Sequence, residues 1–69
     1  DISAAVAAVR ARCTTTAEER AAVDLDRVPE SMSDDDVALA IYERTGTLLP
    51  RTSVRRRRGM QQQAARGAA

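Results

Sequence analysis

The sequence predicts a small all-α domain, built from three packed helices with a further short helix in front of them. Its 69 residues are enough for one domain, and helix-start signals occur at Thr16 and Ser33. Tyr42 is the single aromatic residue. Chains of this length bury only about 60% of their unfolded surface. We therefore expect a helical core of Val, Leu, Ile and Met rather than a sheet sandwich with a ligand cavity.

The first expected helix covers residues 3–12 and is rich in alanine. Ser3 is a good N-cap residue, and Val6 and Val9 lie on one side of the predicted helix. A helix this short is marginally stable alone. We therefore expect it, within an N-terminal arm of residues 1–15, either to dock on the core or to mediate a homodimer.

The second expected helix begins at a capping box, in which Thr16 caps the amide of Glu19 and Glu19 reaches back. Pro29 ends this helix, because the residue before a proline avoids the helical region. Met32 follows in a short loop and is expected to pack against the next helix as a hydrophobic staple. Apolar residues recur at helical spacing before the proline: Ala17, Ala21, Leu25 and Val28.

The third expected helix begins at Ser33, its N-cap, and ends at Gly46 in a left-handed C-terminal cap. Residues 34–36 are three aspartates in the first turn, where carboxylates complement the helix dipole. This role explains them better than a metal site, which needs oxygen ligands at alternating spacing around a glycine turn. The predicted apolar face consists of Val37, Ala38, Ile41, Tyr42 and Thr45.

The fourth expected helix follows a tight connection that contains Leu48 and Leu49. Pro50 presets the backbone for the first helical position. Residues 51–58 continue as helix, which weakens at Gly59. We place the domain at residues 16–59 and a flexible Gln/Ala-rich tail at residues 60–69, which either extends the helix for a turn or two or frays.

The formal charge of +1 hides a division along the chain. Residues 1–50 carry all ten acidic residues and five arginines, a charge of −5, whereas residues 51–69 carry six arginines and no acid, a charge of +6. Such asymmetry indicates a nucleic-acid partner. Since no acid is available within residues 47–69 to pair with the run Arg55–Arg58, we expect something outside the domain to neutralise these charges.

The composition argues against an enzyme and against a membrane protein. The chain has no His and one Cys, so it offers no zinc ligand set, no Cys-His pair and no Ser-His relay. We expect no cofactor, no metal and no small-molecule ligand. No apolar run approaches the ~18 residues of a membrane span. Cys13 cannot form an internal disulfide, which favours a reducing cytoplasm.

Two short helices joined by a turn, the second one basic, are typical of a helix-turn-helix. Ala38 and Gly46 provide small residues where the two helices cross, and Val54 anchors the second helix. With Val54 inward and ~100° per residue, we expect an outward sector facing DNA, with Arg57 nearer the core and reaching a phosphate. Ser53 also suits a phosphate. The expected outward sector comprises Arg51, Thr52, Arg55 and Arg58, with Arg56 at its edge.

The segment Ser33–Arg58, SDDDVALAIYERTGTLLPRTSVRRRR, resembles the helix-turn-helix segments of bacterial and phage DNA-binding proteins. The eight-residue step from Gly46 to Val54 is similar to that in the C-terminal box of the sigma-54 family, where Arg-Thr-Val follows a Gly. The resemblance implies a helix-turn-helix fold and contact with duplex DNA. The residues that it would place on DNA are Arg51, Thr52, Ser53 and Arg55.

Two partner classes and two functions follow from these observations. Arginine-rich segments also bind RNA, but RNA-recognition folds use aromatic stacking platforms, and the capped acidic helix before the arginine run favours duplex DNA. The first functional hypothesis is a sequence-specific phage or bacterial transcriptional regulator or recombination accessory factor. The second is a phage structural or packaging component that contacts nucleic acid non-specifically and whose acidic half binds a basic protein. We expect a protein of the first kind to act in the cytoplasm of the bacterial cell and one of the second kind to lie in the phage particle.

Overall fold

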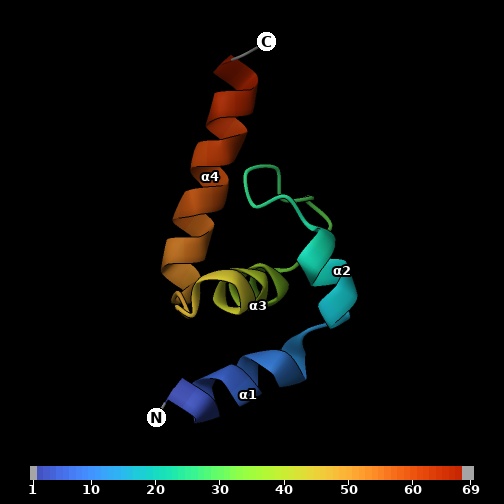
Figure 1. Ribbon diagram of the computed structural model, residues 1–69. Coiled ribbons are helices and arrows are strands. Elements are labelled where there is room, and N and C mark those ends of the chain that lie inside the picture. The colour runs from blue at the N-terminus through green and yellow to red at the C-terminus, as the bar shows by residue number, and fades with distance from the viewer. Residues whose placement is uncertain (1, 68–69) are drawn as a thin grey trace.

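The computed structural model of the chain describes residues 2–67, and the side chains of residues 62 and 64–67 lie outside that description. The described chain forms four helices and no strand, which confirms the all-α fold class (Figure 1). The helices are α1 (Ile2–Arg12), α2 (Ala17–Ala22), α3 (Asp34–Thr45) and α4 (Arg51–Gly67).

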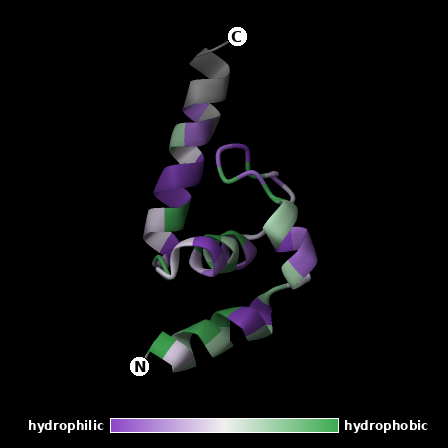
Figure 2. Cartoon of the chain, viewed as in Figure 1, coloured by the Kyte–Doolittle hydropathy of each residue, from purple (hydrophilic) through white to green (hydrophobic). Residues whose placement is uncertain are grey.

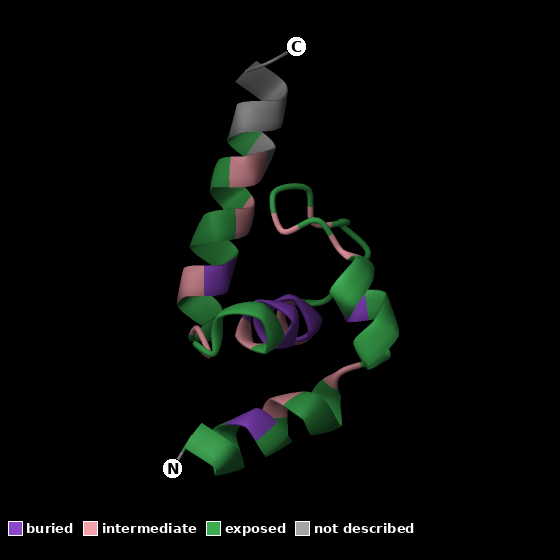
Figure 3. Ribbon diagram, in the orientation of Figure 1, coloured by how far each residue is buried: buried purple, intermediate pink, exposed green. Residues whose placement is uncertain are grey.

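Helix α3 is the centre of the fold, because α1, α2 and α4 all pack against it (Figure 1). Six consecutive residues, Asp36–Ile41, are buried, and Figure 3 shows this run as the largest buried segment. The predicted single apolar face is therefore too narrow: Leu39 and Ala40 are also buried, whereas Thr45 is exposed. A helix covered by three neighbours has no solvent face along its middle turns, so one-sided periodicity does not describe it there.

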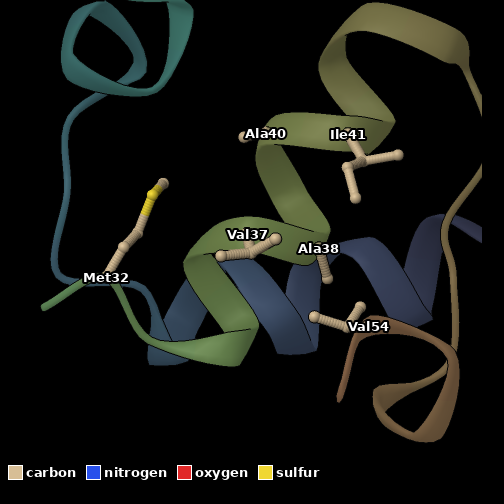
Figure 4. Packing of buried hydrophobic residues seen from close by; sticks show 6 residues of the cluster. All are labelled: Met32, Val37, Ala38, Ala40, Ile41 and Val54. Carbon is tan, nitrogen blue, oxygen red and sulfur yellow. The ribbon is translucent and has the colours of Figure 1, made fainter. Parts of the chain in front are cut away.

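The apolar core joins α3 to the start of α4 and to the loop before α3. Met32 and Val37 are both in the cluster, as expected of a hydrophobic staple that fixes the entry into α3. Val54 of α4 points toward Ala38 of α3 (Figure 4). The buried cluster is Met32, Val37, Ala38, Ala40, Ile41 and Val54, with Val23, Leu25, Val28, Leu48 and Leu49 packed against it.

The capping box of α2 is confirmed, but the predicted length of this helix is wrong. Helix α2 ends at Ala22, six residues before the expected end at Val28. The Asp24 carboxylate accepts a hydrogen bond from the Asp26 amide at 2.9 Å, which forms a local turn that competes with the helix. Leu25 and Val28 consequently reach the core from irregular backbone.

An ion pair, rather than the expected alanine face, attaches α2 to α3. Arg20 is 5% exposed, and its Nε and Nη2 donate to the two carboxylate oxygens of Glu43 at 2.8 and 3.1 Å. Arg44 donates to the carbonyls of Arg20 and Ala21 at the end of α2, at 2.9 and 2.8 Å. The hydrogen bonds from Arg20 hold the pKa of Glu43 below its usual value.

Asp36 connects α3 to the linker between α1 and α2. Its buried carboxylate accepts hydrogen bonds from the amides and hydroxyls of Thr14 and Thr15 and from the Ser33 hydroxyl, at 2.7 to 3.4 Å. Burial alone would raise the pKa of Asp36, but these hydrogen bonds, with one from Cys13, lower it well below its usual value. The third aspartate of α3 therefore does more than complement the helix dipole.

Gly46 ends α3 as predicted, with a left-handed φ of 80°. The expectation that it also lets the two helices approach is wrong, because a Cβ at this position would have no atom within 4 Å other than those of its chain neighbours. Gly46 is required for its backbone conformation. Ala38, which is buried in the core, is the small residue beside α4.

Helix α1 begins one residue earlier than predicted, and α4 extends into the predicted tail, which is one of the two outcomes left open for it. Helix α1 begins at Ile2, so Ser3 lies inside it, and α1 docks on α3 with Val6 buried. Helix α4 continues through Gly59 to Gly67, and the Gln61 amide donates to the Leu25 carbonyl. Of the predicted tail, residues 68 and 69 lie outside the described residues.

Candidate nucleic-acid interface

The arginines of α4 are placed by Val54, which is fully buried and orients the helix. Figure 2 shows the strongly hydrophilic stretch that follows it along α4. Of the seven predicted DNA-contact residues, five are exposed and two, Ser53 and Arg58, are half-buried. The exposed residues are Arg51, Thr52, Arg55, Arg56 and Arg57.

Arg58 faces the protein, so its expected outward orientation is wrong. It stands four residues after Val54 and therefore shares the inward side of the helix. Its Nη1 donates to the Met32 carbonyl at 2.7 Å, and its Nη2 donates to the carbonyls of Pro29 and Glu30 at 3.1 and 3.4 Å. With 17% of its side chain exposed, Arg58 ties the loop before α3 to α4.

The first turn of α3 neutralises part of the arginine run. Asp34 pairs with Arg58 at 2.9 Å and with Arg55 at 3.2 Å. Partial burial alone would raise the pKa of Asp34, but hydrogen bonds from the two guanidinium groups lower it below its usual value. Helix α3 thus supplies an anion that the sequence of α4 lacks.

Asp35 performs a similar role for two arginines from different helices. Its carboxylate lies 3.2 Å from Arg12 Nε and 3.5 Å from Arg51 Nη2. The expectation that the run Arg55–Arg58 finds no partner within the domain is therefore wrong for Arg55 and Arg58, and Arg51 is paired as well. Arg12 is a candidate residue that the sequence analysis missed, because only the packing of α1 on α3 brings it to this edge.

Arg56 and Arg57 remain exposed, and within the described part of the chain neither forms an ion pair. Arg56 stands four residues after Thr52, so these two exposed side chains share the side of α4 opposite Val54. Arg57 stands three residues after Val54, nearer the core side than Arg56, and its side chain is nevertheless exposed. The solvent-facing side of α4 therefore presents two guanidinium groups that the domain does not neutralise.

Replacing Arg58 with Ala is expected to destabilise the fold by roughly 2 kcal/mol, because three backbone carbonyls and Asp34 lose a charged donor. Arg57→Ala removes the same charge from an exposed side chain one residue earlier and should change stability by less than about 0.5 kcal/mol. Urea unfolding followed by circular dichroism measures both. Equal stabilities of the two variants would contradict the structural role of Arg58.

The single cysteine belongs to the same network as Asp36. Cys13 is half-buried, and burial together with its hydrogen bond to Asp36 raises the pKa of the thiol to about 11. The thiol therefore stays protonated at neutral pH and acts as a hydrogen-bond donor, whereas the thiolate is the nucleophilic form.

Two further properties of residues 2–67 bear on the possible ligands. No described helix is both long and apolar enough to cross a bilayer. No group of three or more His, Cys, Asp or Glu side chains within the described chain is arranged to hold a metal ion.

The structure thus defines a small all-α domain in which an arginine-rich helix is anchored on the acidic start of a central helix. No protein-family model matches the chain, and neither a curated protein nor a solved structure matches it.

Proposed function

We propose that this domain binds duplex DNA without catalysing a reaction, with α3 and α4 acting as a helix-turn-helix and α4 entering the major groove. The observation that carries the proposal is the exposed pair Arg56 and Arg57, which no acidic side chain of the described chain neutralises. A solvent-exposed cluster of unpaired guanidinium groups on one helix is the electrostatic footprint of a nucleic-acid contact.

The division of the arginines into paired and unpaired groups supports different proposed roles on DNA. Thr52 and Arg56 lie opposite Val54 and are the candidates for base edges, where Arg bonds guanine O6 and N7 and a Thr methyl meets thymine. Arg51 and Arg55 form ion pairs but are 54% and 67% exposed. Such pairs are worth only about 0–1 kcal/mol, so a DNA phosphate can take over these arginines at small cost.

The remaining predicted residues have supporting roles. Arg57 is exposed at the edge of the same surface and suits a backbone phosphate, as does the half-buried Ser53 in the first turn of α4. Arg58 positions α4 and stays bound to the loop before α3. On this proposal the chain is a phage or bacterial regulator or recombination accessory factor that works in the cytoplasm.

Replacing Arg56 with Ala is expected to weaken binding to the preferred duplex by about 1–3 kcal/mol, close to 5- to 150-fold, because a bidentate base contact is lost. The preferred duplex is obtained first, by selection from random DNA at fixed salt. Fluorescence anisotropy with that duplex and with a scrambled one measures the change. Arg56→Lys is the matched control, since it keeps the charge but not the bidentate geometry.

The same measurements separate the regulator from a non-specific packaging component. A regulator should prefer its selected duplex over scrambled DNA by 10³-fold or more, and Arg56→Lys should lose much of that preference. Equal affinity for every duplex, with the same steep salt dependence for each, would instead indicate the packaging component, which binds DNA through charge alone. A palindromic selected site would indicate a dimer.

A further inference from the structure

We propose that the nucleic-acid interface extends from α4 onto α1. Arg12 of α1 and Arg51 of α4 form a clamp for one backbone phosphate, and in the free protein the Asp35 carboxylate takes the place of that phosphate. This inference rests on the proposed DNA binding and adds to it a residue outside the helix-turn-helix segment. It also assigns Asp35 the role of an internal competitor for the phosphate.

The clamp is defined by one carboxylate that bridges two helices. Asp35 Oδ2 lies 3.2 Å from Arg12 Nε, and Asp35 Oδ1 lies 3.5 Å from Arg51 Nη2. Each guanidinium uses one nitrogen for this contact, and the two arginine side chains are 53% and 54% exposed. Both arginines therefore retain free N–H donors directed to solvent.

A phosphodiester suits this position because it resembles the carboxylate that already holds it. Both groups carry one negative charge and offer two oxygens, and a guanidinium binds either of them in a fork. An exposed ion pair contributes little to stability, so exchanging Asp35 for a phosphate costs little. Asp35 meanwhile keeps the two arginines together before DNA arrives.

The surroundings of the clamp keep the two arginine heads at the surface. Arg12 and Arg51 line a hollow of about 310 Å³ between α1, α3 and the connection before α4. The apolar lining of this hollow lets the arginine stems lie against the protein while the charged heads stay in water. This apolar lining consists of Val9, Ala38, Leu48, Leu49 and Pro50.

The clamp also continues the surface proposed on α4. Arg55 pairs with Asp34, the neighbour of Asp35 in the first turn of α3. Arg12, Arg51 and Arg55 are therefore held by two adjacent carboxylates, and they lead from α1 to α4. A DNA strand that passes α4 along this edge meets Arg12 as its next cation.

The decisive variant is Arg12→Ala, measured by anisotropy on the selected and the scrambled duplex over a range of salt. Binding to both duplexes should weaken by about 3- to 10-fold, and the slope of log affinity against log salt should shrink by about 0.9, the value for one phosphate contact. Arg10→Ala is the matched control. It removes the same charge from the exposed surface of the same helix, at a residue with no Asp35 contact, and should change binding by less than about twofold.

Asp35→Asn tests the competition in the opposite direction. Because the competing negative charge is removed, this variant should bind both duplexes several-fold more tightly, and the gain should shrink when Arg12→Ala is added. Weaker binding by Asp35→Asn would overturn the competitor role. Urea unfolding of each variant shows that the comparison is made between folded proteins.

The outcomes separate this inference from the function on which it rests. If the wild-type protein binds no DNA, both the proposed function and the clamp are wrong. If it binds DNA and Arg12→Ala binds equally well, the clamp alone is wrong. Equal losses in Arg12→Ala and Arg10→Ala would also overturn the clamp, because they would show a general effect of net charge.

Discussion

Replacing Val54 with Asp is expected to unfold the domain at neutral pH. Val54 is fully buried in the cluster that joins α4 to α3 (Figure 4). A carboxylate at this position costs several kcal/mol, because it loses water while Arg58, one turn later on the same side, already donates to Met32 and Asp34. A core of this size provides only about 3–5 kcal/mol in total, so the substitution removes all of it.

The measurement for Val54→Asp is the far-ultraviolet circular dichroism signal and its urea dependence. We expect the cooperative transition to disappear and the helical signal to fall. Thr52→Asp is the matched control, since it places the same carboxylate two residues earlier in α4 on an exposed position. This control should unfold like the wild type. A cooperative, wild-type-like transition in Val54→Asp would show that α4 is not anchored as described.

Replacing Asp36 with Asn is expected to destabilise the domain by roughly 3 kcal/mol. The carboxylate accepts hydrogen bonds from Thr14, Thr15 and Ser33, and an amide offers one acceptor oxygen and places a donor against these donors. Asp26→Asn is the matched control, because that side chain is exposed. Urea unfolding at pH 7 should show a large loss for Asp36→Asn and almost none for Asp26→Asn. Equal stabilities would contradict the connecting role of Asp36.

The same carboxylates predict that acid destabilises the wild-type domain. The pKa values of Asp34, Asp36 and Glu43 are lowered in the folded state, whereas in the unfolded chain Asp and Glu have pKa values of about 3.9 and 4.3. The unfolded state therefore binds more protons in acid. The stability that these groups provide is fully present above about pH 5 and is lost as the pH falls through 4 and below. Urea midpoints at pH 7, 5, 4 and 3 measure this loss, and midpoints that stay constant would contradict it.

The local signals in the sequence predicted the starts of α2 and α3 and the end of α3 correctly, whereas Ser3 does not cap α1. Thr16 and Ser33 cap α2 and α3, and Gly46 ends α3. Each of these features depends on residues within four positions of one another, so the sequence carries the whole interaction. The predicted end of α2 is wrong because the turn at Asp24 competes with the helix, which therefore ends at Ala22 before the chain reaches Pro29.

The candidate site was predicted less well. The sequence indicated an arginine-rich helix and the inward position of Val54, but it placed Arg58 outward and left the arginine run without a partner. The helical geometry was sufficient to place Arg58 correctly, since it stands one turn after Val54. The acidic partners and Arg12 were not predictable in this way, because Asp34 and Asp35 meet the arginines only through contacts more than fifteen residues apart in sequence.

The sequence by itself determined that this chain is helical, where α2 and α3 begin, and that its positive charge is concentrated after Pro50. Only the tertiary structure decided which of these charges face solvent. Packing of α1 and α4 on α3 assigns Arg58 to the loop before α3, pairs Arg12, Arg51 and Arg55 with two aspartates, and leaves Arg56 and Arg57 exposed. The physical reason is that caps and charge counts are local properties of the chain, whereas the partner of a long charged side chain depends on which helices the core brings together.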